Sequence, residues 1–192
     1  MKYQLPSFIV VAAFALLTVP AHGQLLKHYE TQVNSFKLYD AASLAKYAFQ
    51  IDKQRNRTKD NPEDWEDIIF VNRDRTSHIR LIHHPGDKAY EMAGFEVRQG
   101  MPDADEGYYS TVPDKVFMTP NGIMLGLKEN EVTDIQGKAH EIFQEGDYTV
   151  HRYYDGFRQS PILRQYNQTG YIITFWFRNG VLARYSFGFE YP

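Results

Sequence analysis

Two runs of alternating apolar and polar residues flank an Asn-Gly pair near the C-terminal end of the chain. Alternation with a period of two is typical of a β-strand with one buried face. The apolar positions are Tyr171, Ile173, Phe175 and Phe177 in the first run, and Val181, Ala183, Tyr185, Phe187 and Phe189 in the second. A two-residue turn would place the two apolar sets on opposite faces of a sheet, whereas a three-residue loop would place them together. We therefore predict a hairpin with the loop 178–180, in which Gly180 has a positive φ.

The rest of the chain carries both helix and strand signals. Asp40 can cap a helix over residues 40–51, which has apolar residues at helical spacing. A second helix from about Lys128 would end at Gly137, because glycine suits the left-handed position that follows a helix. The other expected elements are strands at 66–71, 77–84, 89–98, 115–118 and 148–154, a short helix at 139–143, a turn at 72–75, and loops at 52–64, 100–113 and 157–170. These elements predict an α+β fold: an antiparallel sheet with helices on one face, built from two similar helix-plus-meander halves.

The first 23 residues have the pattern of a cleavable signal peptide. Lys2 precedes an apolar run at 8–19, and Ala21 and Gly23 supply the small residues of a cleavage site. The apolar run is shorter than the roughly 20 residues that a membrane-spanning helix needs. We therefore expect an exported protein, periplasmic or secreted from a bacterium, with no transmembrane segment in its mature chain. Its parts would be the signal at 1–23, one half at 24–113 and a second half at 114–192.

The composition excludes several classes of protein. The chain has no cysteine, so it has neither disulfides, nor a thiol nucleophile, nor the cysteine that carries a bacterial lipid anchor. Its net charge is −3 and its Lys and Arg residues are scattered, which argues against a nucleic-acid partner. Aromatic residues make up 15% of the chain and favour strands. We therefore expect a β-rich core that is stable without covalent cross-links.

The segment around the second helix resembles a known family. Its characteristic residues are Gly122, Ile123, Leu125 and Gly126, followed by Glu131, Val132, Ile135 and Gly137. Over about residues 119–189 the pattern resembles the SmpA/OmlA (BamE-like) domain. The resemblance implies an α-α-β-β-β unit like the two that β-lactamase inhibitor proteins carry in tandem, and it implies structural residues rather than an active site. Two departures are the absence of a cysteine for lipid attachment and Lys138 in place of a frequent proline.

No catalytic or metal-binding pattern is convincing, so we predict no catalytic, cofactor-binding or metal-binding residues. His83 and His84 are adjacent and would point to opposite faces of a strand. The acidic loop 103–106 has oxygen ligands at alternate positions but lacks the glycine and the distant glutamate of a calcium-binding loop. Neither a nucleophile elbow nor a glycine-rich phosphate loop occurs. We read the histidines and the acidic loop as solvated surface.

The remaining candidates are aromatic residues. Our candidate interaction surface consists of Tyr108, Tyr109, Tyr153, Tyr154 and Trp176. Trp176 would lie on the face opposite the predicted core, where it is either an exposed aromatic patch or part of a second core face; the sequence favours the second. We expect a non-catalytic interaction protein whose partner is another envelope or extracellular protein. The alternatives are a glycan-binding or glycan-processing protein that uses these aromatics with a carboxylate, and a purely structural domain of an envelope complex.

Overall fold

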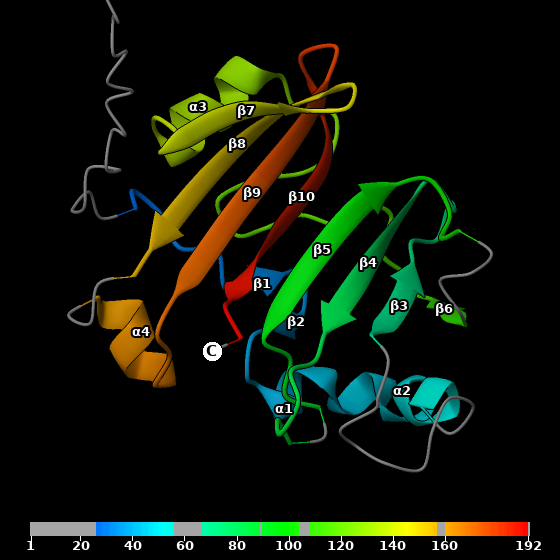
Figure 1. Cartoon of the computed structure of the whole chain (residues 1–192). Coiled ribbons are helices and arrows are strands. Elements are labelled where there is room, and N and C mark those ends of the chain that lie inside the picture. The colour runs from blue at the N-terminus through cyan, green and yellow to red at the C-terminus, as the bar shows by residue number, and fades with distance from the viewer. Residues whose placement is uncertain (1–25, 56–66, 89, 104–107, 157–159, 192) are drawn as a thin grey trace, which may run out of the picture.

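The computed structural model describes residues 26–55, 67–88, 90–103, 108–156 and 160–191. The predicted signal peptide lies outside these residues, as does most of the acidic loop 103–106. The larger sheet has eight strands in the order β6-β3-β4-β5-β10-β9-β8-β7, and a smaller sheet pairs β1 with β2 (Figure 1). The strands are β1 (Gln32–Val33), β2 (Phe36–Lys37), β3 (Ile68–Val71), β4 (Ser77–Ile82), β5 (Gly94–Gln99), β6 (Tyr109–Thr111), β7 (Glu141–Glu145), β8 (Tyr148–Asp155), β9 (Tyr171–Arg178) and β10 (Val181–Phe189).

The helices are short. They are α1 (Ala41–Leu44), the 3₁₀ helix η1 (Ala45–Tyr47), α2 (Ala48–Arg55), α3 (Glu129–Gln136) and α4 (Pro161–Tyr166). Figure 1 shows α3 behind the large sheet, and α1, α2 and α4 near its lower end. The predicted α+β character is confirmed, but the prediction of a simple antiparallel sheet with helices on one face is wrong. The sheet is mixed, because β6 pairs with β3 in the parallel direction.

One face of the large sheet forms the hydrophobic core, and we call it the inner face. Phe70, Ile79, Val97, Tyr185 and Phe175 lie side by side on it, across five neighbouring strands. All five are essentially inaccessible to solvent. Buried side chains of the helices belong to the same core: Leu44, Tyr47, Ile51, Val132, Ile162 and Leu163. The two sequence halves therefore share one core and one continuous sheet, which joins them where β5 pairs with β10.

That junction depends on a pair of glycines. Gly94 of β5 lies opposite Gly188 of β10. A Cβ atom at Gly188 would lie 2.5 Å from the Cα of Gly94 and 2.6 Å from the carbonyl oxygen of Ala93. No side chain fits at position 188, so the two strands come this close because that residue is glycine. A Cβ atom at Gly94 would meet the carbonyl oxygen of Phe187 at 3.3 Å, a tight contact rather than a collision.

The C-terminal hairpin differs from the prediction in its turn. Val181 pairs with Arg178, so Asn179 and Gly180 form a two-residue turn, both at positive φ. A register shift between Leu182 and Arg184 then inserts one extra residue, a β-bulge. The bulge turns Tyr185, Phe187 and Phe189 to the inner face, where the prediction put them. The three-residue loop is therefore wrong, whereas the positive φ of Gly180 and the shared face of these aromatics are confirmed.

Some of the other local predictions are confirmed and some are wrong. Asp40 caps α1, since its Oδ1 accepts hydrogen bonds from the backbone N–H groups of Ala42 and Ser43. Gly137 ends α3 with a φ of 91°. The short helix predicted at 139–143 is wrong, because β7 occupies this region. The predicted loops at 100–113 and 157–170 contain β6 and α4 respectively, and β1 and β2 were not predicted.

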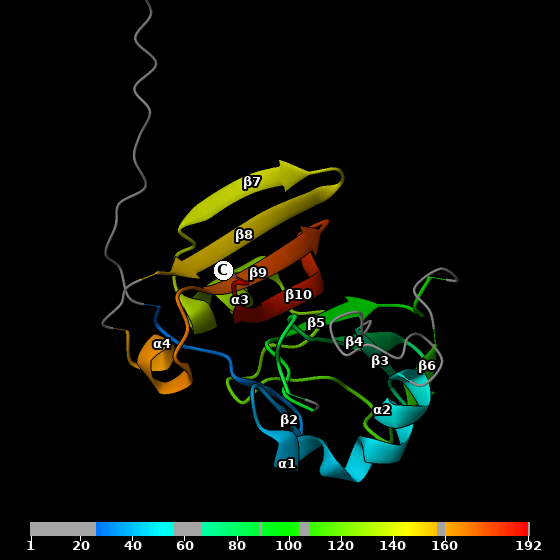
Figure 2. The same ribbon diagram turned by 60° about the horizontal axis from the view of Figure 1, so that its bottom comes forward.

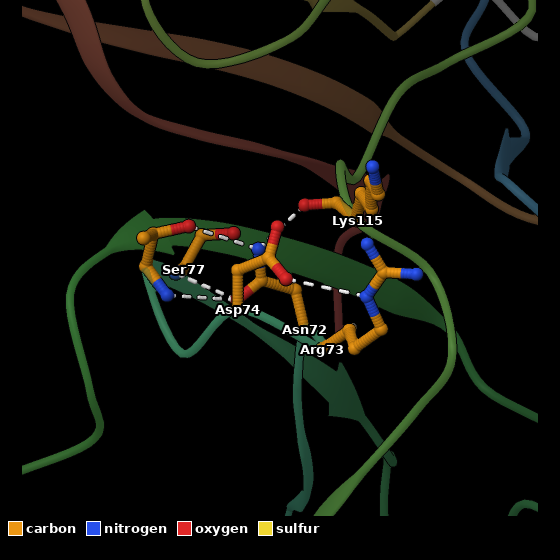
Figure 3. A network of polar contacts seen from close by, with 6 residues as sticks. Asn72, Arg73, Asp74, Ser77 and Lys115 are labelled. Atoms are coloured by element: carbon orange, nitrogen blue, oxygen red, sulfur yellow. Dashed lines mark hydrogen bonds and ion pairs between the residues drawn. The ribbon is translucent and has the colours of Figure 1, made fainter.

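The turn between β3 and β4 is organised by one buried side chain (Figure 3). The Oδ1 atom of Asn72 accepts hydrogen bonds from the backbone N–H groups of Thr76 at 2.8 Å and Ser77 at 3.1 Å. Its Nδ2 atom donates to the hydroxyl of Thr76 and to the carbonyl of Lys115, at 2.9 and 2.6 Å. Asn72 thereby ties the turn predicted at 72–75 to the segment that enters the C-terminal half.

Candidate interaction face

The large sheet has a second face, which we call the outer face. Alternation along each strand places the neighbours of the core residues on this side. Across the sheet, Thr174 and Arg152 continue the row of Arg80, Glu96 and Ser186, and Trp176 lies in the next row beside Arg184. The outer face of β7, β8, β9 and β10 carries Glu141, Phe143, Glu145, Tyr148, Val150, Arg152, Tyr154, Ile172, Thr174, Trp176, Arg178, Arg184 and Ser186.

Trp176 is the centre of this face. Only 7% of it is exposed, and the guanidinium group of Arg184 lies 3.9 Å from its ring centroid. The indole Nε1 donates a hydrogen bond to Glu145 on β7 at 3.3 Å. We expected Trp176 to be either freely exposed or buried in a second core. It is buried, and charged side chains of its own face contribute to its cover: Arg184 over the ring and Glu145 at the indole nitrogen.

Two more arginines of the outer face lie over aromatic rings. Arg152 lies 4.7 Å from the ring centroid of Phe143, and Arg178 lies 4.5 Å from that of Tyr148. In each pair the arginine stands on the strand next to that of its ring. A cation–π contact at an exposed site contributes about 0.5–1 kcal/mol. In all three contacts a long arginine side chain packs on a ring of the neighbouring strand.

Acidic side chains neutralise these arginines. Glu96, which is buried, binds Arg98 at 2.5 Å and accepts a hydrogen bond from the Nε of Arg184 at 2.7 Å. Asp147 pairs with Arg178 at 2.7 Å, and Glu141 pairs with Arg152 at 3.5 Å. The outer face is therefore a mixed surface of paired charges and aromatic rings rather than a basic patch.

The five predicted residues do not lie together. Trp176 and Tyr154, which is 45% exposed, are on the outer face of β9 and β8. Tyr108 and Tyr109 are exposed near the far edge of the sheet, and four strands separate β6 from β9. The distance from β6 to β9 is therefore five inter-strand spacings of about 4.8 Å, or about 24 Å. Tyr153 points into the core, where its hydroxyl donates to the carbonyl of Gly137 at 2.9 Å and burial raises its pKa to about 12.

At the end of the outer face, Tyr154 lies near a carboxylate. Partial burial and the neighbouring Glu190 raise the pKa of the Tyr154 hydroxyl. The main-chain N–H of Tyr154 donates to the Nδ1 atom of His140 at 3.2 Å. This end of the sheet therefore presents an exposed aromatic ring with an acidic neighbour.

His83 and His84 contact neighbouring groups of the protein itself. His83 contacts the carbonyl of Asp87 through Nε2 at 3.2 Å, and the ring of His84 packs edge-on against Tyr191. Burial lowers the pKa of both, which favours their neutral forms. Among the described residues, no group of three or more histidine or acidic side chains is arranged to hold a metal ion. The described residues also include no helix that is long and apolar enough to span a membrane.

An open hollow of about 610 Å³ lies between the start of α3 and the β9–β10 turn. It is lined by Lys128, Glu129, Asn130, Thr133, Asp134, Asn179, Gly180 and Val181. Most of these side chains stand at the surface, so the hollow resembles a shallow depression between two elements rather than a closed binding site.

Comparison with protein-family models, characterised proteins and solved structures found no match.

Proposed function

We propose that this chain is an exported, non-catalytic interaction protein, periplasmic or secreted, that binds another protein through the outer face of β7–β10. The arrangement around Trp176 carries this proposal: a large aromatic side chain stacked by Arg184 and surrounded by two further arginine–aromatic pairs. Trp, Tyr and Arg are the residues that contribute most of the binding energy at protein interfaces.

The fixed geometry of this face supports the same conclusion. Arg152, Arg178 and Arg184 each contact both a ring and an acidic side chain. Side chains that are already ordered lose less conformational entropy when a partner binds. The buried side chains of the helices belong to the core on the inner face. Within the described ranges, the helices thus pack their buried side chains on the other side of the sheet, and partly exposed residues such as Arg152 and Tyr154 of the outer face can meet a partner.

A relationship of residues 119–189 to the SmpA/OmlA domain is part of the proposal. It is supported by the structural positions of the pattern residues: Ile123 and Val132 are completely buried, and Gly137 ends α3. The region contains four strands, with α4 between β8 and β9, whereas the resemblance implies three strands. The order α3-β7-β8-α4-β9-β10 therefore departs from the implied α-α-β-β-β order by one additional strand and by the position of its second helix.

The proposal is tested by affinity capture from native envelope extract and from polysaccharide fractions, with the purified protein as bait. The double variant Arg152→Ala/Tyr154→Ala removes two partly exposed side chains of the outer face. Phe49→Ala is the matched control, because Phe49 is 76% exposed but lies on α2. We expect wild type and control to retain one protein stoichiometrically, and the double variant to lose it.

Equal retention by the double variant would contradict the use of the outer face. Retention of polysaccharide without any protein would contradict the proposal altogether and favour the glycan-binding alternative.

A further inference from the structure

The strand β7 forms one edge of the large sheet. In the described part of the chain it pairs with β8 and with no other strand, and Figure 2 shows its far side open. Four of its five residues are exposed, including Ile142 at 59%. An edge strand of this kind leaves a row of backbone N–H and C=O groups without partners inside the protein, and these groups can bind another strand.

The opposite edge of the sheet is different. β6 has only three residues, and the side chain of Gln54 binds the adjacent strand beside it. The Oε1 atom of Gln54 accepts from the N–H of Ile69 at 3.0 Å, and its Nε2 donates to the carbonyl of Ile69 at 3.1 Å. Gln54 thus satisfies the backbone of β3 as a strand residue would. β7 is consequently the longer of the two edges and the better template for an added strand.

The charges on β7 restrict what can pair with it. Glu141, Phe143 and Glu145 all lie on the outer-face side. If two copies of β7 paired antiparallel about Phe143, each Glu141 would stand opposite a Glu145. Like charges directly opposite each other destabilise a strand pair. A second copy of this chain is therefore disfavoured in this register, whereas a strand with basic residues at the matching positions is favoured.

We propose that β7 binds an extended segment of the partner protein as an added antiparallel strand, with a basic, an apolar and a basic side chain facing Glu145, Phe143 and Glu141. The inference rests on the proposed function, because β7 borders the outer face and one partner would contact both. The added strand gains main-chain hydrogen bonds from the edge, and the two glutamates select its sequence.

The two glutamates have the capacity for this role. The side chain of Glu141 is 51% exposed although it already contacts Arg152 at 3.5 Å. Glu145 is exposed and accepts one hydrogen bond, from Trp176. A carboxylate offers about four lone-pair positions. Each glutamate can therefore accept a further hydrogen bond from a lysine or arginine. On the other side of β7, Ile142 offers apolar surface to an added strand.

The test uses a capped synthetic peptide as the probe. Its central residues are lysine, threonine, valine, valine and lysine, which in antiparallel pairing face Glu145, Gln144, Phe143, Ile142 and Glu141. Three control peptides carry glutamate in place of both lysines, proline at the centre, or N-methyl groups on the backbone. Binding is measured by titration, and the exchange of backbone amides by NMR, on protein purified after expression of the full chain. We expect only the unmodified lysine peptide to bind, and to slow amide exchange along β7.

A charge reversal in the protein supplies the matched comparison. Glu141→Lys/Glu145→Lys should weaken binding of the lysine peptide by about tenfold or more and create binding of the glutamate peptide. The control variant Asp74→Lys/Asp134→Lys changes the net charge equally without altering β7, and should bind the lysine peptide as wild type does.

Three results would overturn strand addition. These are equal binding of the N-methylated peptide, protection of β9 and β10 amides without β7, and no binding of the lysine peptide to wild type. The added strand and the proposed function can fail independently of each other. If capture of an envelope protein depends on Arg152 and Tyr154 but not on Glu141 and Glu145, the outer face binds its partner and the added strand does not exist.

Discussion

Replacing Asn72 with alanine should destabilise the protein severely, although Asn72 belongs to a turn. The side chain makes four hydrogen bonds, with Thr76, Ser77 and Lys115 (Figure 3). At about 1 kcal/mol for each bond, the loss in free energy of unfolding is about 4 kcal/mol. Asn72→Asp retains the two bonds that Oδ1 accepts, and the Thr76 hydroxyl can donate to its second oxygen. That oxygen would also face the carbonyl of Lys115 and would bury a negative charge, so the loss for Asn72→Asp should be about as large as that for Asn72→Ala. Urea denaturation followed by circular dichroism measures both values.

Arg73→Ala is the matched control in the same turn. Arg73 is half exposed and pairs with Asp74 at 3.2 Å, and an exposed ion pair contributes about 0–1 kcal/mol. The reasoning is refuted if Asn72→Ala loses no more stability than Arg73→Ala.

Three further predictions concern the core, the junction of the sheet and the outer face. Burial raises the pKa of Glu30 above its ordinary value of 4.5, and Thr119 and Asn121 offset only part of this rise. The folded protein therefore binds the Glu30 proton more tightly than the unfolded chain does. As the pH rises from about 4.5 through the folded-state pKa, the free energy of unfolding of wild type should fall relative to that of Glu30→Gln. Equal pH profiles of the two proteins in urea denaturation would contradict this. Gly188→Ala should cost about 1–3 kcal/mol in thermal unfolding, since its Cβ would collide with the backbone of β5; an unchanged melting temperature would contradict this. In a Trp65→Phe background, Arg184→Ala should make Trp176 more accessible to acrylamide quenching, because Arg184 covers its ring; unchanged quenching would contradict this.

Features that depend on short stretches of sequence could be predicted. The cap at Asp40, the end of α3 at Gly137 and the alternation of β9 each result from neighbouring residues. Alternation determines which side chains share a face whatever the partner strand is. The sequence alone therefore placed Trp176 on the face opposite the core.

Features that depend on distant partners could not be predicted. The segment around β7 contains Ala139, Glu141, Gln144 and Glu145, which favour a helix in isolation. It forms a strand because it pairs with β8, and because Arg152 of that strand packs over Phe143. Strand preference depends on such neighbours more than on intrinsic tendency. The parallel pairing of β6 with β3 is likewise a long-range contact, which no local sequence pattern predicts.

The arrangement of side chains on the outer face also depends on a feature that the sequence does not determine. The contact between Arg184 and Trp176 exists because the bulge after Leu182 shifts the register by one residue. Without the bulge, the two-residue turn would place Arg184 opposite Phe175 on the inner face. Both the alternation and the Asn-Gly pair are visible in the sequence, but their conflict can be resolved by a longer loop or by a bulge. Only the structure distinguishes these two solutions.

The central claim is that the outer face binds another protein. The most direct measurement is photo-crosslinking in cells that express the chain, with a photoreactive phenylalanine analogue at Tyr154 and, as the control, at Phe49. Both residues are exposed, but only Tyr154 is on the outer face. Our account predicts one crosslinked protein product of defined mass from Tyr154 and none from Phe49. Crosslinks of equal yield from both positions, or none from Tyr154, would contradict it.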